Sequence, residues 1–126
     1  MLESMRRFKA DIFQALAHPT RIAMVEYLQT NELTVTDLCA KVGVEQANAS
    51  QHLAVLRNKY IVQTRKEGNQ IFYRLRDQTF AKVLQALREF FLSHITEAME
   101  ILREEQEDAT VKQPTKKATK VGSKRR

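Results

Sequence analysis

Apolar residues recur every three or four positions through the first part of the chain, which is the spacing of one face of an α-helix. The pattern predicts a helix that ends at residues 18–19, because proline disfavours a helical conformation in the residue before it. Pro19 suits the first turn of a second helix, which residues 30–32 break. The two predicted apolar stripes are Met5, Phe8, Ile12 and Leu16, followed by Ile22, Val25 and Leu28.

Two shorter helices are predicted next. Thr34 precedes Asp37 by three residues, as in a capping box, and Gly43 is a suitable left-handed end for the helix that this box begins. A following helix begins near Gln46, and the short connection at residues 42–44 predicts a helix-turn-helix. The residues expected inside this pair of helices are Leu38, Ala49, Leu53 and Leu56.

After Tyr60 the pattern changes to alternation. Residues 61–66 and 70–75 read as two strands around "EGN", which predicts a β-hairpin. Asp77 is expected to cap a long final helix, so the expected fold class is mainly α (α+β), with about five helices and a two-stranded hairpin. The apolar stripe of the final helix is Phe80, Val83, Leu84, Leu87, Phe91, Ile95, Ala98 and Leu102.

Composition narrows the class of protein. The chain has 126 residues, of which 43% are hydrophobic, enough for one modest core. We expect one domain at residues 1–109 and a disordered basic tail at 110–126, where few apolar side chains are available for burial. No apolar run approaches the roughly 18 residues that cross a bilayer, the N-terminus does not have a signal-peptide layout, and Cys39 is the only cysteine. These features predict a soluble, cytoplasmic protein.

The formal net charge of +6 is distributed unevenly. Residues 1–111 hold 14 bases and 15 acids, whereas residues 112–126 hold 7 bases and no acid. Residues 45–76 are locally basic and residues 97–108 are strongly acidic. The tail is expected either to bind DNA without sequence preference and with strong salt dependence, or to fold back on the acidic segment.

The helix expected at residues 46–59 begins with short polar side chains. In a helix-turn-helix the second helix enters the major groove of DNA, where Asn and Gln pair with adenine and Ser contacts bases or phosphates. The basic and amide residues of the hairpin are placed to contact phosphates or a minor groove. The predicted DNA contacts are Gln46, Asn48, Ser50, Gln51, His52, Arg57, Lys59, Arg65, Lys66, Asn69 and Gln70.

Simpler interpretations of these residues remain open. The polar helix face is an ordinary solvated face in one alternative. His52 is a half-buried histidine bonded to the backbone in another. In a third alternative, Arg74 and Arg76 simply point outward from a strand into solvent.

Four stretches, in this order, resemble the ArsR/SmtB family of bacterial winged helix-turn-helix repressors: "LAHPTRIAMVEYL", "ELTVTDLCAKVGV", "SQHLAVLRNKYIV" and "TRKEGNQIFYRL". The resemblance covers about residues 8–100. It implies a homodimer that is paired through its first and last helices and that binds an inverted repeat in double-stranded DNA. The long final stripe agrees, since it exceeds what one small domain can bury. The expected dimer residues are Phe8, Ile12, Phe80, Leu84, Leu87, Phe91, Ile95 and Leu102.

Metal-sensing members of this family carry ligands that are mostly replaced here. Thr34 and Thr36 stand at the position of the Cys-x-Cys pair of arsenic and lead sensors, and hydroxyls are poor ligands for those soft ions. His94 and Glu97 match the second ligand pair of zinc and nickel sensors, but the first pair is missing. We therefore expect no metal and no cofactor, with His94 and Glu97 as weak candidates. A small inducer of unknown identity stays open.

Two positions depart from the family pattern. Tyr60 stands where the family usually has a glycine, so either Asn58 takes the left-handed conformation or the turn differs. Glu45 occupies a helix-cap position that Ser or Asp usually fills, close to where phosphates are expected.

Three other functions compete with that of a sequence-specific repressor. An architectural protein would take most of its DNA affinity from the tail, and deletion of residues 112–126 distinguishes it. A protein-interaction module would not need the bases of the predicted DNA-facing elements. An enzyme is not expected, because His18, His52 and His94 fall on different predicted helices without a nucleophile or paired carboxylate nearby.

Overall fold

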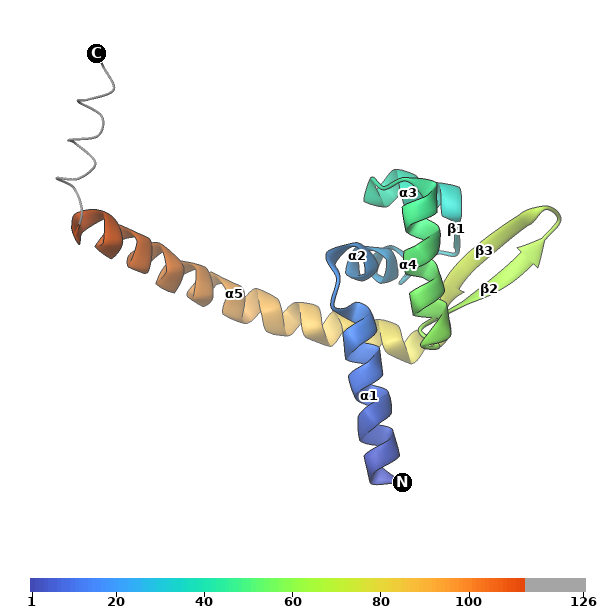
Figure 1. Cartoon of the computed structure of the whole chain (residues 1–126), viewed down its shortest axis with the longest axis horizontal. Helices are drawn as coiled ribbons and strands as arrows, with labels where there is room; N and C mark the ends of the chain where they lie inside the picture. Colours follow the sequence, from blue (N-terminus) through green and yellow to red (C-terminus); the bar gives the residue numbers. More distant parts are fainter. Residues whose placement is uncertain (113–126) are drawn as a thin grey trace, which may run out of the picture. The chain divides into compact units, whose positions relative to one another are not determined.

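The computed structural model describes residues 1–112 of the chain (Figure 1). Within these residues the structure contains five helices and a β-hairpin, as the sequence predicts. Contacts divide the described residues into two units, residues 1–85 and 86–112. Residues 110–112, the start of the predicted disordered tail, are helical, and the rest of that tail, from residue 113, lies outside the described residues. The elements are α1 (Leu2–Leu16), α2 (Pro19–Tyr27), β1 (Leu33–Thr34), α3 (Val35–Val42), α4 (Gln46–Asn58), β2 (Val62–Glu67), β3 (Gln70–Leu75) and α5 (Gln78–Lys112).

One hydrophobic core holds the first unit together. The prediction that Ile22 is buried is wrong: its side chain is 40% exposed, whereas Met24 is fully buried. Met24 shares the inner face of α2 with Leu28, one turn later, and this places Ile22 at the edge of that face. The buried residues of the core are Ala15, Leu16, Met24, Val25, Leu28, Leu33, Leu38, Ala49, Leu53, Leu56, Ile61, Val62, Leu75 and Leu84.

Local caps set where the helices begin and end. The Thr34 hydroxyl accepts a hydrogen bond from the Asp37 amide at 3.1 Å, and Gly43 ends α3 with a φ of 82°. Asp77 accepts a hydrogen bond from the Thr79 amide at 2.8 Å, and the pKa of Asp77 is lowered by this bond. The caps predicted at Thr34, Gly43 and Asp77 are therefore confirmed.

The hairpin strands β2 and β3 belong to a three-stranded antiparallel sheet in the order β1-β3-β2. Val62 pairs with Leu75 at the base of the hairpin, and both side chains are buried in the core. The additional strand β1 pairs only with Phe72 and Tyr73, and two residues are too few to show alternation in a sequence. The outer part of the hairpin therefore extends past β1, as Figure 1 shows.

The end of α4 corrects the expectation for Asn58. Tyr60, not Asn58, adopts the left-handed conformation, with a φ of 63°. The Tyr60 amide donates to the Arg57 carbonyl and the Ile61 amide donates to the Leu56 carbonyl, both at 3.0 Å. This is the hydrogen-bond pattern of a Schellman motif. Leu56 and Ile61 are both buried, so core packing fixes the turn despite the unfavourable residue.

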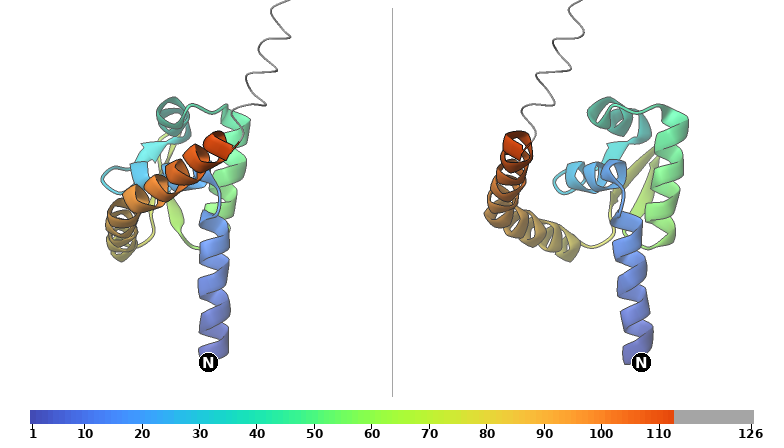
Figure 2. Two further views of the ribbon diagram at one scale, coloured as in Figure 1. Left: turned by 90° about the vertical axis from the view of Figure 1, so that its left-hand side faces the viewer. Right: turned by 60° about the vertical axis from the view of Figure 1, so that its left-hand side comes forward.

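Several apolar side chains remain exposed on α1 and on the distal part of α5. The first ten residues are exposed, and Figures 1 and 2 show α1 extending away from α2, α3 and α4. In the second unit, Phe91, Ile95 and Leu102 are each at least 50% exposed. No helix within residues 1–112 is long and apolar enough to cross a membrane.

Candidate nucleic-acid interface

The helix α4 is anchored by its apolar residues and exposes its polar ones. Ala49, Leu53 and Leu56 have 0% exposed area. Gln46 and Ser50 lie one turn apart on one flank of the exposed face, and Asn48 and His52 lie one turn apart on the other. The side chains of Gln46, Asn48, Ser50 and Gln51 are exposed, and none of them has a side-chain hydrogen bond to another residue of the described part of the chain.

Two small residues, which the sequence analysis missed, lie on the same exposed face. Ala47 and Ala54 are exposed on α4. Their periodicity places them between the two polar flanks, near Gln51. A surface of small and amide side chains permits close approach of a helix to base edges, and alanine can contact a thymine methyl group. Only the burial of the opposite face identifies these alanines as part of the candidate surface.

The N-terminus of α4 lacks a side-chain capping hydrogen bond. Glu45 is the N-cap residue, and its side chain makes no capping hydrogen bond. A carboxylate at a helix N-terminus interacts favourably with the helix dipole. The same charge opposes an approaching phosphate, so Glu45 lowers the anion affinity of this end.

His52 belongs to a cluster that joins α2 and α4. Its ring centre lies 4.4 Å from that of His18, and its Nδ1 lies 3.4 Å from Nη1 of Arg21. Arg21 also donates to the Ala15 carbonyl at 2.6 Å. The side-chain partner of His52 is thus Arg21, in place of the backbone group considered above. Burial lowers the pKa of His52, and the neighbouring His18 and Arg21 lower it further. His52 is therefore mostly uncharged at neutral pH.

His18 has a second role that the sequence analysis did not identify. It is the N-cap residue of α2, and its Nδ1 accepts a hydrogen bond from the Thr20 amide at 3.1 Å. Pro19 occupies the first turn. The His18 ring thus fixes the start of α2 while it packs against His52 of α4.

The bases at the end of α4 differ in their surroundings. Arg57 is exposed in the last turn. The Lys59 Nζ atom lies 3.7 Å from a carboxylate oxygen of Asp11 on α1, and both side chains are more than 40% exposed. Exposed pairs of this length contribute little to stability, so both bases are accessible to a phosphate.

The pleat of the hairpin separates two bases that the sequence analysis grouped together. Successive residues of a strand point to opposite faces of the sheet. Lys66 shares its face with Val62, whose side chain lies in the core that α4 also covers, whereas Arg65 points to the other face. Lys66 is exposed and forms no ion pair with the rest of residues 1–112. It is therefore the hairpin base on the same side of the sheet as α4.

Arg65 is already engaged by two carboxylates. Its Nη1 donates to Glu67 at 2.6 Å, and its Nε donates to Glu32 at 2.9 Å. The hydrogen bond to Glu67 and then that to Glu32 raise the pKa of Arg65, and hydrogen bonds from Arg65 lower the pKa of Glu32. A phosphate would have to replace one of these partners, which the prediction of Arg65 as a DNA contact did not anticipate.

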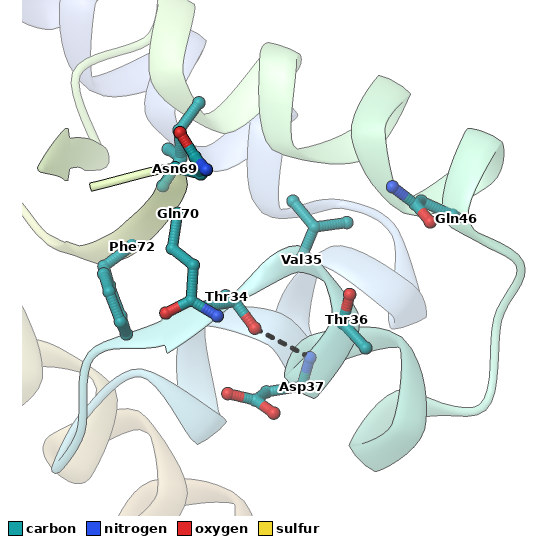
Figure 3. Close-up of a pocket in the computed structure, with 9 residues that line it drawn as sticks. Thr34, Val35, Thr36, Asp37, Gln46, Asn69, Gln70 and Phe72 are labelled. Atoms are coloured by element: carbon teal, nitrogen blue, oxygen red, sulfur yellow. Dashed lines mark hydrogen bonds between the residues drawn. The ribbon is translucent and has the colours of Figure 1, made fainter. Parts of the chain in front are cut away.

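An open pocket of about 470 Å³ lies between the start of α3, the start of α4 and the tip of the hairpin (Figure 3). It brings together Gln46, Asn69 and Gln70, three of the predicted DNA contacts. Asp37 is the one charged side chain among the described residues that line it. The pocket therefore presents amide and hydroxyl groups to a ligand, and the Asp37 carboxylate makes one side of it acidic.

The weak metal candidates do not form a complete site in the described residues. His94 Nδ1 lies 2.8 Å from the Phe90 carbonyl oxygen, and the His94 ring stacks on Phe90 with centres 4.4 Å apart. No cluster of three or more His, Cys, Asp or Glu side chains that could hold a metal ion occurs within residues 1–112. Cys39 packs against the hydrophobic core.

The predicted dimer residues fall into two groups. Leu84 is only 7% exposed and belongs to the core of its own unit, so little of its surface is left for a partner chain. Ile12 and Phe80 are partly buried against the same core, and Leu87 lies just beyond the boundary of the two units. The exposed members of the predicted set are Phe8, Phe91, Ile95 and Leu102.

Comparison with known proteins agrees with this arrangement. Residues 18–64 match the family described as bacterial regulatory protein, arsR family. The chain is 42% identical over 82 residues to the biofilm growth-associated repressor of Agrobacterium fabrum, and the match covers 65% of this chain and 70% of that protein. It is 32% identical over 103 residues to the uncharacterized HTH-type transcriptional regulator Rv0081 of Mycobacterium tuberculosis, covering 81% and 90% of the two chains.

Solved structures show the same fold. The crystal structure of Mycobacterium tuberculosis Rv0081 superimposes with a TM-score of 0.70 at 32% identity, and the match covers 75% of this chain and 96% of that one. The transcriptional repressor BigR of Xylella fastidiosa gives a TM-score of 0.65 at 37% identity, with 71% and 92% covered.

A helix pair with an exposed polar second helix, next to a β-hairpin on a shared core, defines a winged helix-turn-helix domain. The chain belongs to the ArsR family of bacterial regulatory proteins. In the terms of this fold, α4 is the recognition helix and the β2–β3 hairpin is the wing.

Proposed function

We propose that this protein is a homodimeric, sequence-specific DNA-binding repressor that recognises an inverted repeat. The observation that carries the proposal is the exposed face of α4. Its amide and hydroxyl side chains are accessible to a ligand, while the apolar residues of the opposite face are fully buried. The repressors named above support the regulatory role, and their names give no indication of an enzyme.

In this proposal the N-terminal half of α4 lies in the major groove. Asn48 and Gln51 pair with base edges, and Ser50 contacts a base or a phosphate. Arg57 and Lys59 neutralise phosphates at the other end of the helix, while Lys66 and Asn69 of the wing contact the neighbouring backbone. The uncharged His52 contributes contact surface rather than charge.

The dimer is proposed from exposed apolar side chains. Phe8 of α1 is 48% exposed, and Phe91 and Leu102 of α5 are 56% and 58% exposed. Side chains of this size are seldom left in water over a continuous surface of a monomer. Pairing of two chains about a two-fold axis would present two recognition helices and so favour an inverted repeat.

The test is selection of bound duplexes from a random DNA pool by the full chain at about 0.15 M salt, because salt sets the non-specific background. The wild type is expected to enrich an inverted repeat, and the double variant Asn48→Ala/Ser50→Ala is expected to lose it. Gln14→Ala, a matched polar-to-alanine change on α1, should retain it. A chain without residues 112–126 should keep the same preferred sequence.

The result that overturns the proposal is enrichment of no sequence by the wild type, or of one loose pool by both wild type and double variant. Loss of all binding on removal of residues 112–126 would indicate an architectural protein instead.

A further inference from the structure

Glu32, in the connection between α2 and β1, contacts both strands of the wing. Its Oε1 accepts a hydrogen bond from Nε of Arg65 at 2.9 Å and lies 2.8 Å from Nη2 of the same residue. Its Oε2 accepts a hydrogen bond from Nη1 of Arg74 at 3.2 Å. Because Arg65 is on β2 and Arg74 is on β3, one carboxylate joins both wing strands to the body of the domain.

Neighbouring groups fix the same two arginines. The Arg65 guanidinium lies 4.8 Å from the centre of the Phe72 ring, which is its cross-strand neighbour. The Gln63 side-chain oxygen accepts hydrogen bonds from Nε and Nη2 of Arg74 at 2.9 Å each, in the amide orientation that satisfies both groups. Hydrogen bonds of an ionised group are shorter and stronger than neutral ones, and two bonds from one guanidinium to the same group restrict its orientation. Both guanidinium groups therefore have defined positions.

The contacts of Glu32 with Arg65 and Arg74, called the clamp below, act on the inner part of the wing, at the level of β1. Val62 and Leu75 fix the base of the hairpin in the core, and β1 reaches only Phe72 and Tyr73. Beyond these contacts the hairpin depends on its own strand pairing, and an isolated two-stranded hairpin is only marginally stable. A small rotation about the base would displace the tip.

We propose that Glu32 is a positioning residue of the wing: by holding Arg65 and Arg74 it sets the angle at which Lys66 and Asn69 meet the DNA backbone. The inference rests on the proposed function. It also assigns Arg65 to holding the wing in place of the phosphate contact expected from the sequence. Lys66, which points to the α4 side of the sheet, is then the cation of the wing that binds phosphate.

The test uses the full-length protein and the preferred duplex found by selection. Glu32→Gln keeps the size of the side chain and removes the charge that holds both arginines. It is expected to weaken binding about tenfold. The slope of log K against log salt should become shallower by roughly 1.8, because each of the two wings of the dimer loses its Lys66 contact and one phosphate contact contributes roughly 0.9. A simple loss of folded protein would not change that slope.

Glu67→Gln is the matched control. It also removes one negative charge next to Arg65, but the Glu67 carboxylate bonds only to Arg65, on its own strand. Its affinity is expected to stay within about twofold of the wild type. Lys66→Gln should weaken DNA binding of the wild type about as much as Glu32→Gln does. In the Glu32→Gln background it should cause no further loss of affinity, since the effects of coupled residues are not additive.

Tighter binding and a steeper salt slope for Glu32→Gln would overturn the proposal, since Glu32 would then compete with phosphates for the two arginines. Equal losses for Glu32→Gln and Glu67→Gln would also overturn it, because the contacts of Glu32 with both strands would then matter no more than the contact of Glu67 within β2. If the wild type selects no DNA sequence, the proposed function fails. Amide hydrogen exchange then still tests the clamp: Glu32→Gln should lose protection in β2 and β3 but not in α4, and unchanged wing protection would refute it.

Discussion

The guanidinium of Arg76 lies 5.3 Å from the centre of the Tyr60 ring, next to the left-handed backbone of Tyr60 itself. A left-handed conformation costs a residue with a Cβ atom about 1–2 kcal/mol. A cation–π contact at an exposed site offsets about 0.5–1 kcal/mol of this. The Tyr60 ring is 60% exposed, so little further packing compensates the strain.

Replacement of Tyr60 by glycine is therefore expected to stabilise the domain. Tyr60→Gly should raise the free energy of unfolding by about 0.5–1 kcal/mol, because glycine adopts this conformation without a steric penalty. The measurement is urea denaturation at fixed protein concentration. Gly43→Ala is the opposite control: its φ is 82° and an added Cβ would meet nothing within 4 Å, so backbone strain alone should lower stability. A loss of stability in Tyr60→Gly would show that the ring stabilises the turn by more than the strain.

Glu45 allows capping and charge to be separated. Glu45→Ser should stabilise α4 by about 1 kcal/mol, since serine caps a helix N-terminus well. Glu45→Gln removes the same charge without providing a good cap, and it should leave stability unchanged or slightly reduced. Both variants should bind DNA more tightly than the wild type, measured by fluorescence anisotropy at two salt concentrations. If only Glu45→Ser binds more tightly, helix order rather than charge limits the affinity.

The His52 cluster predicts a loss of stability in acid. The pKa of His52 in the folded protein lies below its ordinary value of 6.5, so the unfolded chain binds more protons in this range. The His52 contribution is complete above about pH 6.5 and decreases as the pH falls towards the folded-state pKa, below which it stays constant. Unfolding measured between pH 8 and pH 5 should show this slope. His52→Gln should reduce the slope, and His94→Gln, on the exposed part of α5, should retain it.

Leu84 and Phe91 separate folding from dimer formation. Leu84 is buried in the core, so Leu84→Ala should lower the free energy of unfolding by about 2–5 kcal/mol. Phe91 is 56% exposed, and Phe91→Ala should instead raise the dimer dissociation constant at least tenfold. Analytical ultracentrifugation over a range of concentrations provides the measurement. A Phe91→Ala protein with unchanged self-association would place the dimer interface elsewhere.

Most of the secondary structure was predictable from local signals in the sequence. Pro19, the Thr34 cap and Gly43 act within one helical turn, so their effects are readable without knowledge of the fold. The alternation of β2 and β3 and the burial of Ala49, Leu53 and Leu56 follow from side-chain periodicity in the same way. The identity of the recognition helix was predictable because its polar and apolar positions follow one period.

Contacts between distant segments decided the rest. Glu32 and Arg65 are 33 residues apart, and no local pattern indicates that they pair. Leu84 looks like the rest of the α5 stripe, yet only the packed domain shows that it is buried in its own core. Tyr60 adopts a left-handed conformation because Leu56 and Ile61 on either side of it are held in that core. Periodicity and capping chemistry thus determined the elements, while packing determined which charged and apolar side chains remained free to bind, because burial and ion pairing depend on neighbours that the linear order does not give.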